Sequence, residues 1–261
     1  MRATWLTDIH LNFMRPLALQ KFYERVRAEQ PHILLVTGDI GEADSVARFV
    51  GELAEIAPIY FVLGNHDYYR SSIANVRAAM QRIDERATWL PAIEPLRLTP
   101  RVVMLGVDGW GDARCGDTAS KVELSDWNLI DDFKRGRAAR VEILNRLGGN
   151  EARALREQLA RAPESPELLV LTHVPPFPES CVYDGVQSDP AWLPWFTCIA
   201  TGEVLVEHAR AHPEQKITVL CGHAHGVGTF AALPNLEVKT GGWPADTEQY
   251  GNPIIQQTLE L

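Results

Sequence analysis

The sequence has few of the features that mark secreted, membrane or disulfide-rich proteins. Its 4 cysteines form neither a CxxC pair nor a zinc-finger spacing. A reduced protein is the simpler interpretation, and a Cys181–Cys198 bridge stays conceivable from the spacing. The first residues lack the apolar core of a signal peptide. No apolar run approaches the ~20 residues that span a bilayer. We therefore expect a cytoplasmic protein that does not enter a membrane.

Positive charge is also scarce. Lys and Arg number 25 against 34 Asp and Glu, which gives a net charge of −9. This balance makes broad nucleic-acid binding an unlikely function without excluding it, and it leaves room for a local positive centre such as a metal site. The sequence shows no internal repeat, low-complexity tract or linker. We therefore expect one domain over residues 1–261.

Short apolar runs alternate with helical patterns along the first third of the chain. Branched apolar residues predict buried strands at 2–7, 32–37 and 58–63. Apolar residues spaced three and four apart predict helices at 16–30, 46–53 and 73–83. This alternation is typical of βαβ units, and it predicts an α/β fold with a largely parallel sheet.

The pattern is looser beyond residue 90. We expect further strands at 101–107, 167–172 and 216–220, and short strands within 227–260. Residues 121–162 are predicted to be mostly helical, with a break near Gly148 and Gly149. Residues 174–198 are rich in proline and aromatic residues and have no clean period. A long irregular segment of this kind is usually a functional loop.

Polar residues follow five of the predicted strands at the point where each strand ends. In open α/β sheets, ligands bind just beyond the carboxyl ends of the strands. Each motif alone could be a turn or a helix cap. Together they supply the carboxylate oxygens and imidazole nitrogens that suit Mn, Fe, Zn or Ni. The motifs are Asp8-Ile9-His10, Gly38-Asp39, Gly64-Asn65-His66-Asp67, His173 and Gly222-His223-Ala224-His225.

This order of motifs resembles that of the calcineurin-like metallophosphoesterases, and the resemblance extends from Asp8 to His225. It implies a β-sandwich flanked by helices, in an αββα arrangement, with a dinuclear metal centre at the edge where the strands end. By this resemblance the first metal is held by Asp8, His10 and His225, the second by Asn65, His173 and His223, and both by Asp39.

The resemblance also implies a reaction. Two divalent cations would outweigh the charges of Asp8 and Asp39, so the site could bind a phosphate group despite the acidic chain. A hydroxide bridging the two metals would attack phosphorus. We expect manganese among the four candidate metals, and a small-molecule phosphate ester as substrate.

His66 has a separate role in this comparison. The histidine of the G-N-H motif protonates the leaving group as a general acid, which suits the ordinary pKa of histidine. Two carboxylates could hold its ring, Glu42 and Asp67. Protein phosphatases of the superfamily have a carboxylate at the position of Glu42, which favours Glu42. Asp67 could equally be a turn carboxylate.

One departure narrows the substrate. The Ser/Thr protein phosphatases continue with Asp-Arg-Gly after the G-D motif, and their arginine holds the phosphate. Ala43 occupies the place of that arginine. We therefore expect a phosphomonoesterase or phosphodiesterase of small molecules. Arg70 and Arg114 follow predicted strands and could replace the arginine, although exposed surface arginines are more common.

The aromatic side chains of the irregular segment come soon after His173. They could form one wall of the substrate pocket and stack on a flat group, or they could simply pack the segment onto the body of the protein. These aromatic residues are Phe177, Tyr183, Trp192, Trp195 and Phe196.

Two other functions compete with phosphate ester hydrolysis. A non-catalytic scaffold could keep the fold, but scaffolds usually lose ligands or the G-N-H histidine, and every position is filled here. A dinuclear hydrolase of C–N bonds would share the ligands, yet the G-N-H-D motif favours phosphoryl chemistry. Monoester or diester preference and the oligomeric state stay open at this point.

Overall fold

Two β-sheets form the centre of the computed structural model, which describes residues 1–83, 85–245 and 251–261. The first sheet has the order β13-β1-β2-β3-β4 and the second the order β11-β12-β10-β7-β6-β5. Strands β1 to β4 run parallel, as do β6, β7, β10 and β12. The edge strands β13, β11 and β5 are antiparallel to their neighbours. The predicted parallel βαβ units are therefore present, divided between two sheets.

The strands of the first sheet are β1 (Arg2–Leu6), β2 (Ile33–Thr37), β3 (Ile59–Val62), β4 (Ala87–Trp89) and β13 (Ile255–Glu260). Those of the second are β5 (Leu96–Arg97), β6 (Val102–Gly106), β7 (Glu167–Leu171), β10 (Lys216–Cys221), β11 (Gly228–Leu233) and β12 (Leu236–Thr240). A small hairpin joins β8 (Val182–Tyr183) to β9 (Val186–Gln187).

The helices are α1 (Pro16–Ala28), α2 (Val46–Ala54), α3 (Ile73–Met80), α4 (Asp126–Leu129), α5 (Arg137–Arg161), α6 (Leu193–Phe196) and α7 (Ile199–Ala211). Single 3-10 turns occur at Leu11–Phe13, His66–Tyr68, Leu90–Ala92, Asp131–Phe133 and Pro178–Ser180. No helix of the described ranges combines the length and hydrophobicity needed to cross a bilayer.

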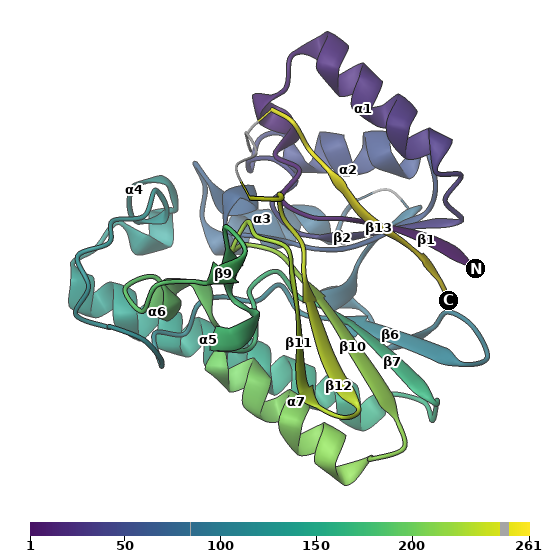
Figure 1. Ribbon diagram of the computed structural model, residues 1–261. Helices are drawn as coiled ribbons and strands as arrows, with labels where there is room; N and C mark the ends of the chain where they lie inside the picture. The colour runs from purple at the N-terminus through teal and green to yellow at the C-terminus, as the bar shows by residue number, and fades with distance from the viewer. Residues whose placement is uncertain (84, 246–250) are drawn as a thin grey trace.

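Three apolar layers hold this arrangement together. Trp5, Leu35, Met104 and Leu169 belong to the layer between the two sheets. Helices α1, α2 and α3 cover the outer face of the first sheet, and α5 and α7 cover that of the second (Figure 1). Strand β2 is buried along its whole length, which explains its continuous apolar sequence. The αββα sandwich that the motifs implied is confirmed.

Helix α5 corrects one expectation. Residues 121–136 contain only α4 and one 3-10 turn, and α5 then continues without a break through Gly148 and Gly149. A side chain at Gly148 would collide with Asp112, so this glycine permits close packing within the helix instead of ending it.

Two other expectations concern the cysteines and the end of the chain. All four cysteines are free, so Cys181 and Cys198 form no bridge. The predicted short strands of 227–260 appear as β11, β12 and β13, while residues 246–250 of that range lie outside the described residues.

Candidate active site

Loops at the carboxyl ends of β1 and β2 are locked together by backbone hydrogen bonds. The Asp8 amide donates to the carbonyl of Gly38 (3.1 Å), and the His10 amide donates to that of Asp39 (2.9 Å). Asp8, His10 and Asp39 all have positive φ angles, of 50°, 41° and 54°. Non-glycine residues adopt this left-handed conformation at a cost, and such strain concentrates at functional sites.

Two glycines allow the loops to approach the carboxylates. A Cβ on Gly64 would collide with the Asp39 side chain and backbone. A Cβ on Gly222 would collide with the carboxylate of Asp8 and the hydroxyl of Thr7. The G-N-H-D and G-H-x-H motifs therefore begin with glycine because a larger residue would displace the carboxylates.

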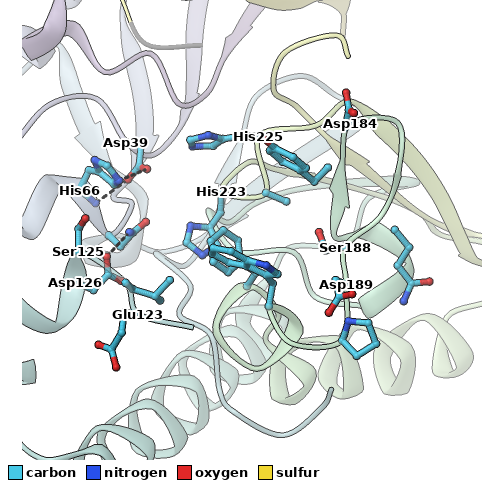
Figure 2. Close-up of a pocket in the computed structure, with 18 of the residues that line it drawn as sticks. Asp39, His66, Glu123, Ser125, Asp126, Asp184, Ser188, Asp189, His223 and His225 are labelled. Atoms are coloured by element: carbon cyan, nitrogen blue, oxygen red, sulfur yellow. Dashed lines mark hydrogen bonds and ion pairs between the residues drawn. The ribbon is translucent and has the colours of Figure 1, made fainter. Parts of the chain in front are cut away.

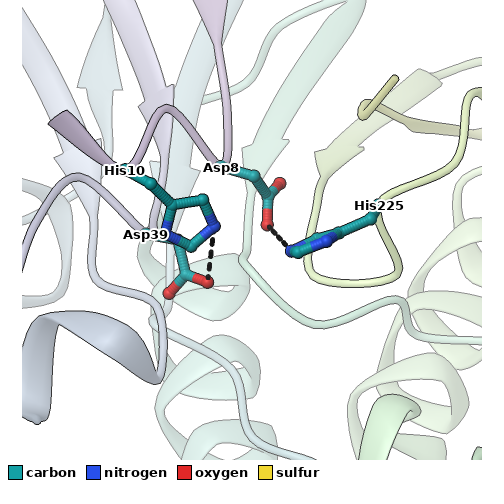
Figure 3. A group of neighbouring side chains, drawn as sticks. All are labelled: Asp8, His10, Asp39 and His225. Atoms are coloured by element: carbon teal, nitrogen blue, oxygen red, sulfur yellow. Dashed lines mark ion pairs between the residues drawn. The ribbon is translucent and has the colours of Figure 1, made fainter. Parts of the chain in front are cut away.

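A first group of donor atoms consists of Asp8, His10, Asp39 and His225, whose ligand atoms lie within 4.8 Å of one another. Nε2 of His10 is 3.7 Å from Oδ2 of Asp39, and Nε2 of His225 is 3.5 Å from Oδ1 of Asp8 (Figure 3). Asp8 is oriented by the hydroxyl of Thr7, which donates to Oδ2 at 2.7 Å.

A second group consists of Asp39, His173 and His223, so Asp39 belongs to both. Nε2 of His173 is 3.4 Å from Oδ1 of Asp39 and 3.2 Å from Oδ1 of Asn65. The other ring nitrogen, Nδ1, donates to the carbonyl of Thr37 at 2.7 Å. This bond fixes the tautomer and leaves Nε2 to face the site, as outer partners of metal-binding histidines do.

The two carboxylates of the site respond differently to their surroundings. Burial raises the pKa of Asp8, and the nearby charge of Asp39 adds to this effect. Burial also acts to raise the pKa of Asp39, but His173 and His66 outweigh it and hold the pKa well below its usual range. The burial of His173 is likewise outweighed by Asp39 and Asp8, which raise its pKa to about 10.

This donor set fits two divalent cations. Oδ2 of Asp39 is buried and has no hydrogen-bond partner among the described residues. Oδ2 is 3.7 Å from His10 of the first group and Oδ1 is 3.4 Å from His173 of the second, so the carboxylate of Asp39 contacts both groups, which suits a bridging ligand. Imidazole, carboxylate and amide donors are those that Mn, Fe, Zn and Ni accept. The structure thus brings together all seven residues that the sequence predicted as metal ligands.

Comparison with known proteins identifies the family. The family model described as calcineurin-like phosphoesterase matches residues 1–227. The chain belongs to the calcineurin-like phosphoesterase family.

Solved structures share the fold of this phosphoesterase. A phosphopantetheinyl hydrolase from Mycobacterium tuberculosis is 16% identical, with a TM-score of 0.67 over 93% of this chain and 89% of that one. A dimetal phosphatase from Danio rerio is 14% identical, with a TM-score of 0.51 over 92% and 86%. Family and fold together support phosphoester hydrolysis in general.

A curated relative from Bos taurus is described as a transmembrane protein with metallophosphoesterase domain. It is 29% identical over 90 residues, which is 32% of this phosphoesterase chain. The match spans 20% of that relative's length, so it concerns only a part of the larger protein.

His66 lies beside the donor groups. Its Nε2 is 4.0 Å from Oδ2 of Asp39, and its backbone amide donates to Oδ1 of the same residue at 2.9 Å. The ring stacks on Tyr69, with centroids 4.2 Å apart. Nδ1 is buried and has no hydrogen-bond partner among the described residues, and His66 lines the cavity over the site.

The two carboxylates expected to hold the His66 ring bind elsewhere. Glu42 accepts from Nε of Arg70 at 2.5 Å and from Asn12 at 3.4 Å. Asp67 accepts from the backbone amides of Ile40, Gly41 and Gly64 at 2.8–2.9 Å. Neither carboxylate has a hydrogen bond to the His66 ring in the described part of the chain. Asp67 instead ties the loop of Asp39 to the loop of His66, and burial and the Asp39 charge raise its pKa to about 7.

A cavity of about 1100 Å³ opens over the donor groups. Tyr183, Trp192 and Phe196 line it, which agrees with one of the two roles considered for the aromatic segment. Phe177 packs against Phe230, and Trp195 packs in the core. The segment therefore both walls the cavity and anchors itself to the body.

Neither arginine considered for phosphate binding lines this cavity. Arg70 pairs with Glu42, and both terminal nitrogens of Arg114 donate to Glu203, at 2.8 and 2.7 Å. Both therefore belong to surface ion pairs.

Sequence reasoning missed the residues that support the ligands. Asp126 accepts from Asn65 at 2.9 Å and from the Tyr69 hydroxyl at 2.7 Å. Trp243 packs against the rings of His10 and His225. Asp126 is 61 residues from Asn65, and no local spacing signals such a contact.

Proposed function

We propose that this chain is a dinuclear metal-dependent hydrolase of small phosphate esters, acting as a phosphomonoesterase or phosphodiesterase. The observation that carries the proposal is the pair of donor groups that share Asp39 beneath a cavity lined by His66. Manganese as the metal, a cytoplasmic location and a single domain over residues 1–261 belong to the same proposal.

The protein residues divide the work as follows. Asp8, His10 and His225 would hold one cation, Asn65, His173 and His223 the other, and Asp39 both. Two divalent cations bound there supply an activated water and neutralise the charge of the phosphate.

His66 would supply the proton that the reaction needs. Hydrolysis forms a bond from a water oxygen to phosphorus and breaks the bond from phosphorus to the ester oxygen. The departing oxygen takes a proton from Nε2 of His66. The attacking water releases a proton to solvent, and His66 takes up a proton from solvent before the next reaction. Stacking on Tyr69 and the backbone bond to Asp39 hold the ring in place for this transfer.

Asp39→Asn tests the proposal. Loss of a shared charged ligand is expected to reduce bound metal below two ions per chain. It should also lower the rate of hydrolysis of p-nitrophenyl phosphate and bis-p-nitrophenyl phosphate by more than about 100-fold. Mutation of residues that only hydrogen-bond to metal ligands already lowers metal affinity or activity by about 10- to 100-fold, and Asp39 would be a ligand itself. Metal-stripped protein reloaded with Mn²⁺ would be used throughout.

Asp44→Asn is the matched control. It makes the same change on the loop that follows Asp39, at an exposed position, and it should keep both metal content and rate. Two bound metals without hydrolysis of either ester would favour the alternative function, a scaffold that retains the fold.

A further inference from the structure

The cavity over the site has walls of unequal character. Asp39, His223 and His225 belong to the donor groups and line the cavity, and we call this part of its lining the floor. Figure 2 shows Asp39, His66 and Asp126 at one side and Asp184 and Asp189 at the other, with His223 and His225 between them. The second side belongs to the aromatic segment that follows His173.

Acidic side chains line this cavity, and no lysine or arginine is among its described lining residues. Besides Asp39 there are four carboxylates among these residues. One of them, Asp126, accepts hydrogen bonds from Asn65 and Tyr69. Glu123 lies 3.8 Å from Arg140. The other two, Asp184 and Asp189, are exposed on the aromatic wall and form no ion pair within the described ranges, although Oδ1 of Asp189 accepts from the amide of Ala191 at 2.8 Å. Their negative charge is therefore available to a ligand.

Two large aromatic side chains line the same cavity as these two carboxylates. Tyr183 and Trp192 keep 53% and 43% of their surface exposed although they line a cavity. The face of an aromatic ring attracts cations, and alkylammonium groups bind where such rings and carboxylates meet. A phosphate dianion gains nothing from this wall, and a polyanionic substrate would be repelled by it.

The floor of the cavity has the opposite preference. Asp39 lines the cavity, and its buried Oδ2 has no hydrogen-bond partner in the described part of the chain; cations held there would attract an anion. A ligand that spans the cavity therefore meets a centre for negative charge at one end and aromatic rings with carboxylates at the other.

We propose that the substrate is a phosphate ester whose alcohol carries a positively charged ammonium group. This inference rests on the proposed hydrolase function and names its substrate class. The phosphate lies at the floor, and the ammonium group lies between Tyr183, Trp192 and the carboxylates of Asp184 and Asp189.

Isosteric substrates isolate the charge. Phosphocholine is compared with 3,3-dimethylbutyl phosphate, in which carbon replaces the charged nitrogen, and the p-nitrophenyl diesters of the same two alcohols form a second pair. For the pair that is hydrolysed, kcat/KM is expected to be at least about 10-fold higher with the charged member. Equal values, or a higher value for adenosine monophosphate, would overturn the inference and leave the hydrolase function intact.

Variants connect the preference to the wall. The double variant Asp184→Asn, Asp189→Asn should bring the charged-to-neutral ratio down by at least about threefold. Glu179→Gln, an exposed carboxylate of the same segment outside the cavity, should preserve it. A ratio unchanged in the double variant would show that these carboxylates do not select the substrate.

A binding measurement tests the ammonium site independently of the proposed hydrolase activity. If p-nitrophenyl phosphate, its diester and both pairs all remain intact, the proposed hydrolase fails. Calorimetric titration of the Mn²⁺-loaded protein with phosphocholine and 3,3-dimethylbutyl phosphate still measures the cavity. Tighter binding of phosphocholine would support the ammonium site, and equal or weaker binding would refute it.

Discussion

His66 depends on packing for its orientation. Its ring contacts Tyr69 on one face and His10 at an edge, with centroids 4.2 and 4.5 Å away. Tyr69 is in turn fixed through its hydroxyl by Asp126 at 2.7 Å. Packing therefore orients the ring although no carboxylate of the described residues is hydrogen-bonded to Nδ1.

Replacing this histidine by His66→Asn should reveal its role through the leaving group. Alkyl phosphates need a proton on the departing oxygen, so kcat/KM is expected to fall by about 10²–10⁴-fold. p-Nitrophenolate departs without taking up a proton, so kcat/KM for its phosphate ester should fall much less. Rates across esters with leaving groups of graded pKa measure this difference. An equal loss for all esters would show that His66 positions other groups and donates no proton.

Trp243 supports two candidate ligands from behind. Its ring is 5.2 Å from His225 and 6.4 Å from His10, and its indole NH donates to the carbonyl of Asn252 at 2.9 Å. Trp243→Leu should loosen both imidazoles and weaken Mn²⁺ binding by about 10- to 100-fold, as outer partners of metal ligands do. Titration of metal-stripped protein measures the affinity. Trp192→Leu, on the cavity wall, should keep it, and an equal loss in the two variants would argue against this role for Trp243.

The polar motifs were visible in the sequence because each comes soon after a predicted strand, and the resemblance to the family selected the seven candidate ligands among them. Their supports could not be predicted in this way. Thr37 meets His173 across 136 residues, and Asp126 meets Asn65 across 61. The position of Glu42 gave no indication that Arg70 would engage it.

Between the two sheets, Asp108 connects several elements behind the site. Its Oδ1 accepts from the Leu63 amide and the Trp89 indole at 2.9 and 2.8 Å. Its Oδ2 accepts from the Tyr68 hydroxyl at 2.8 Å and from Arg77 at 3.0 Å. The carbonyl of the same residue accepts from the amide of His173. The carboxylate of Asp108 thus joins the loop after β6 to the end of β3, to β4 and to α3, and its backbone carbonyl reaches a candidate ligand.

Asp108→Asn should destabilise the fold by about 3 kcal/mol. Arg77 is only partly accessible to water, and it would lose one of its two buried carboxylate partners and keep only Glu151. The unfolding midpoint is expected to fall by about 6–12 °C. Asp131→Asn, which removes an exposed pair with Lys134, should change stability by less than about 0.5 kcal/mol. Thermal unfolding of both variants tests this, and equal midpoints would contradict it.

The local sequence pattern predicted which segments form helices and strands, but it did not predict where these elements end or which contacts their residues make. The glycine pair within α5 looked like a helix break, yet Gly148 serves contact with Asp112, which belongs to a distant loop. Residues 121–136 carry helical spacing but are mostly irregular. There, Asp126 and Trp127 are committed to the site and the core respectively. Tertiary contacts determine the structure of both segments, and helix propensity, which depends on the local sequence alone, cannot predict such contacts.

At the scale of the whole molecule, periodicity predicted parallel strands without assigning them to sheets. Leu35 of β2 and Leu169 of β7 are both fully surrounded, and they meet in the same layer although they belong to different sheets. Buried parallel strands are apolar on both faces, so their sequences cannot say which neighbour each face meets. The two-sheet arrangement came from the resemblance of the motifs.

Both sheets contribute ligands, so metal binding should stabilise the molecule as a whole. Asp8 and His173 follow strands of different sheets, and burial together with the charge of Asp39 raises the pKa of Asp8. Cations relieve that repulsion. Mn²⁺ at 100 times its dissociation constant is expected to add about 2.7 kcal/mol and to raise the unfolding midpoint by about 5–10 °C, and a chelator should reverse the change.

Acid should diminish this stabilisation. Because the metal-free pKa of His173 is raised to about 10, that imidazole carries a proton at neutral pH which a metal must displace. Raising the pH removes the competing proton, so the Mn²⁺-induced shift in midpoint should grow from pH 6 to pH 9. Thermal unfolding with and without Mn²⁺ across this range measures the trend, with Asp44→Asn as the variant that retains it and Asp39→Asn as the one that loses it. A shift independent of pH would mean that the cation binds without displacing the proton of His173, and therefore at other residues.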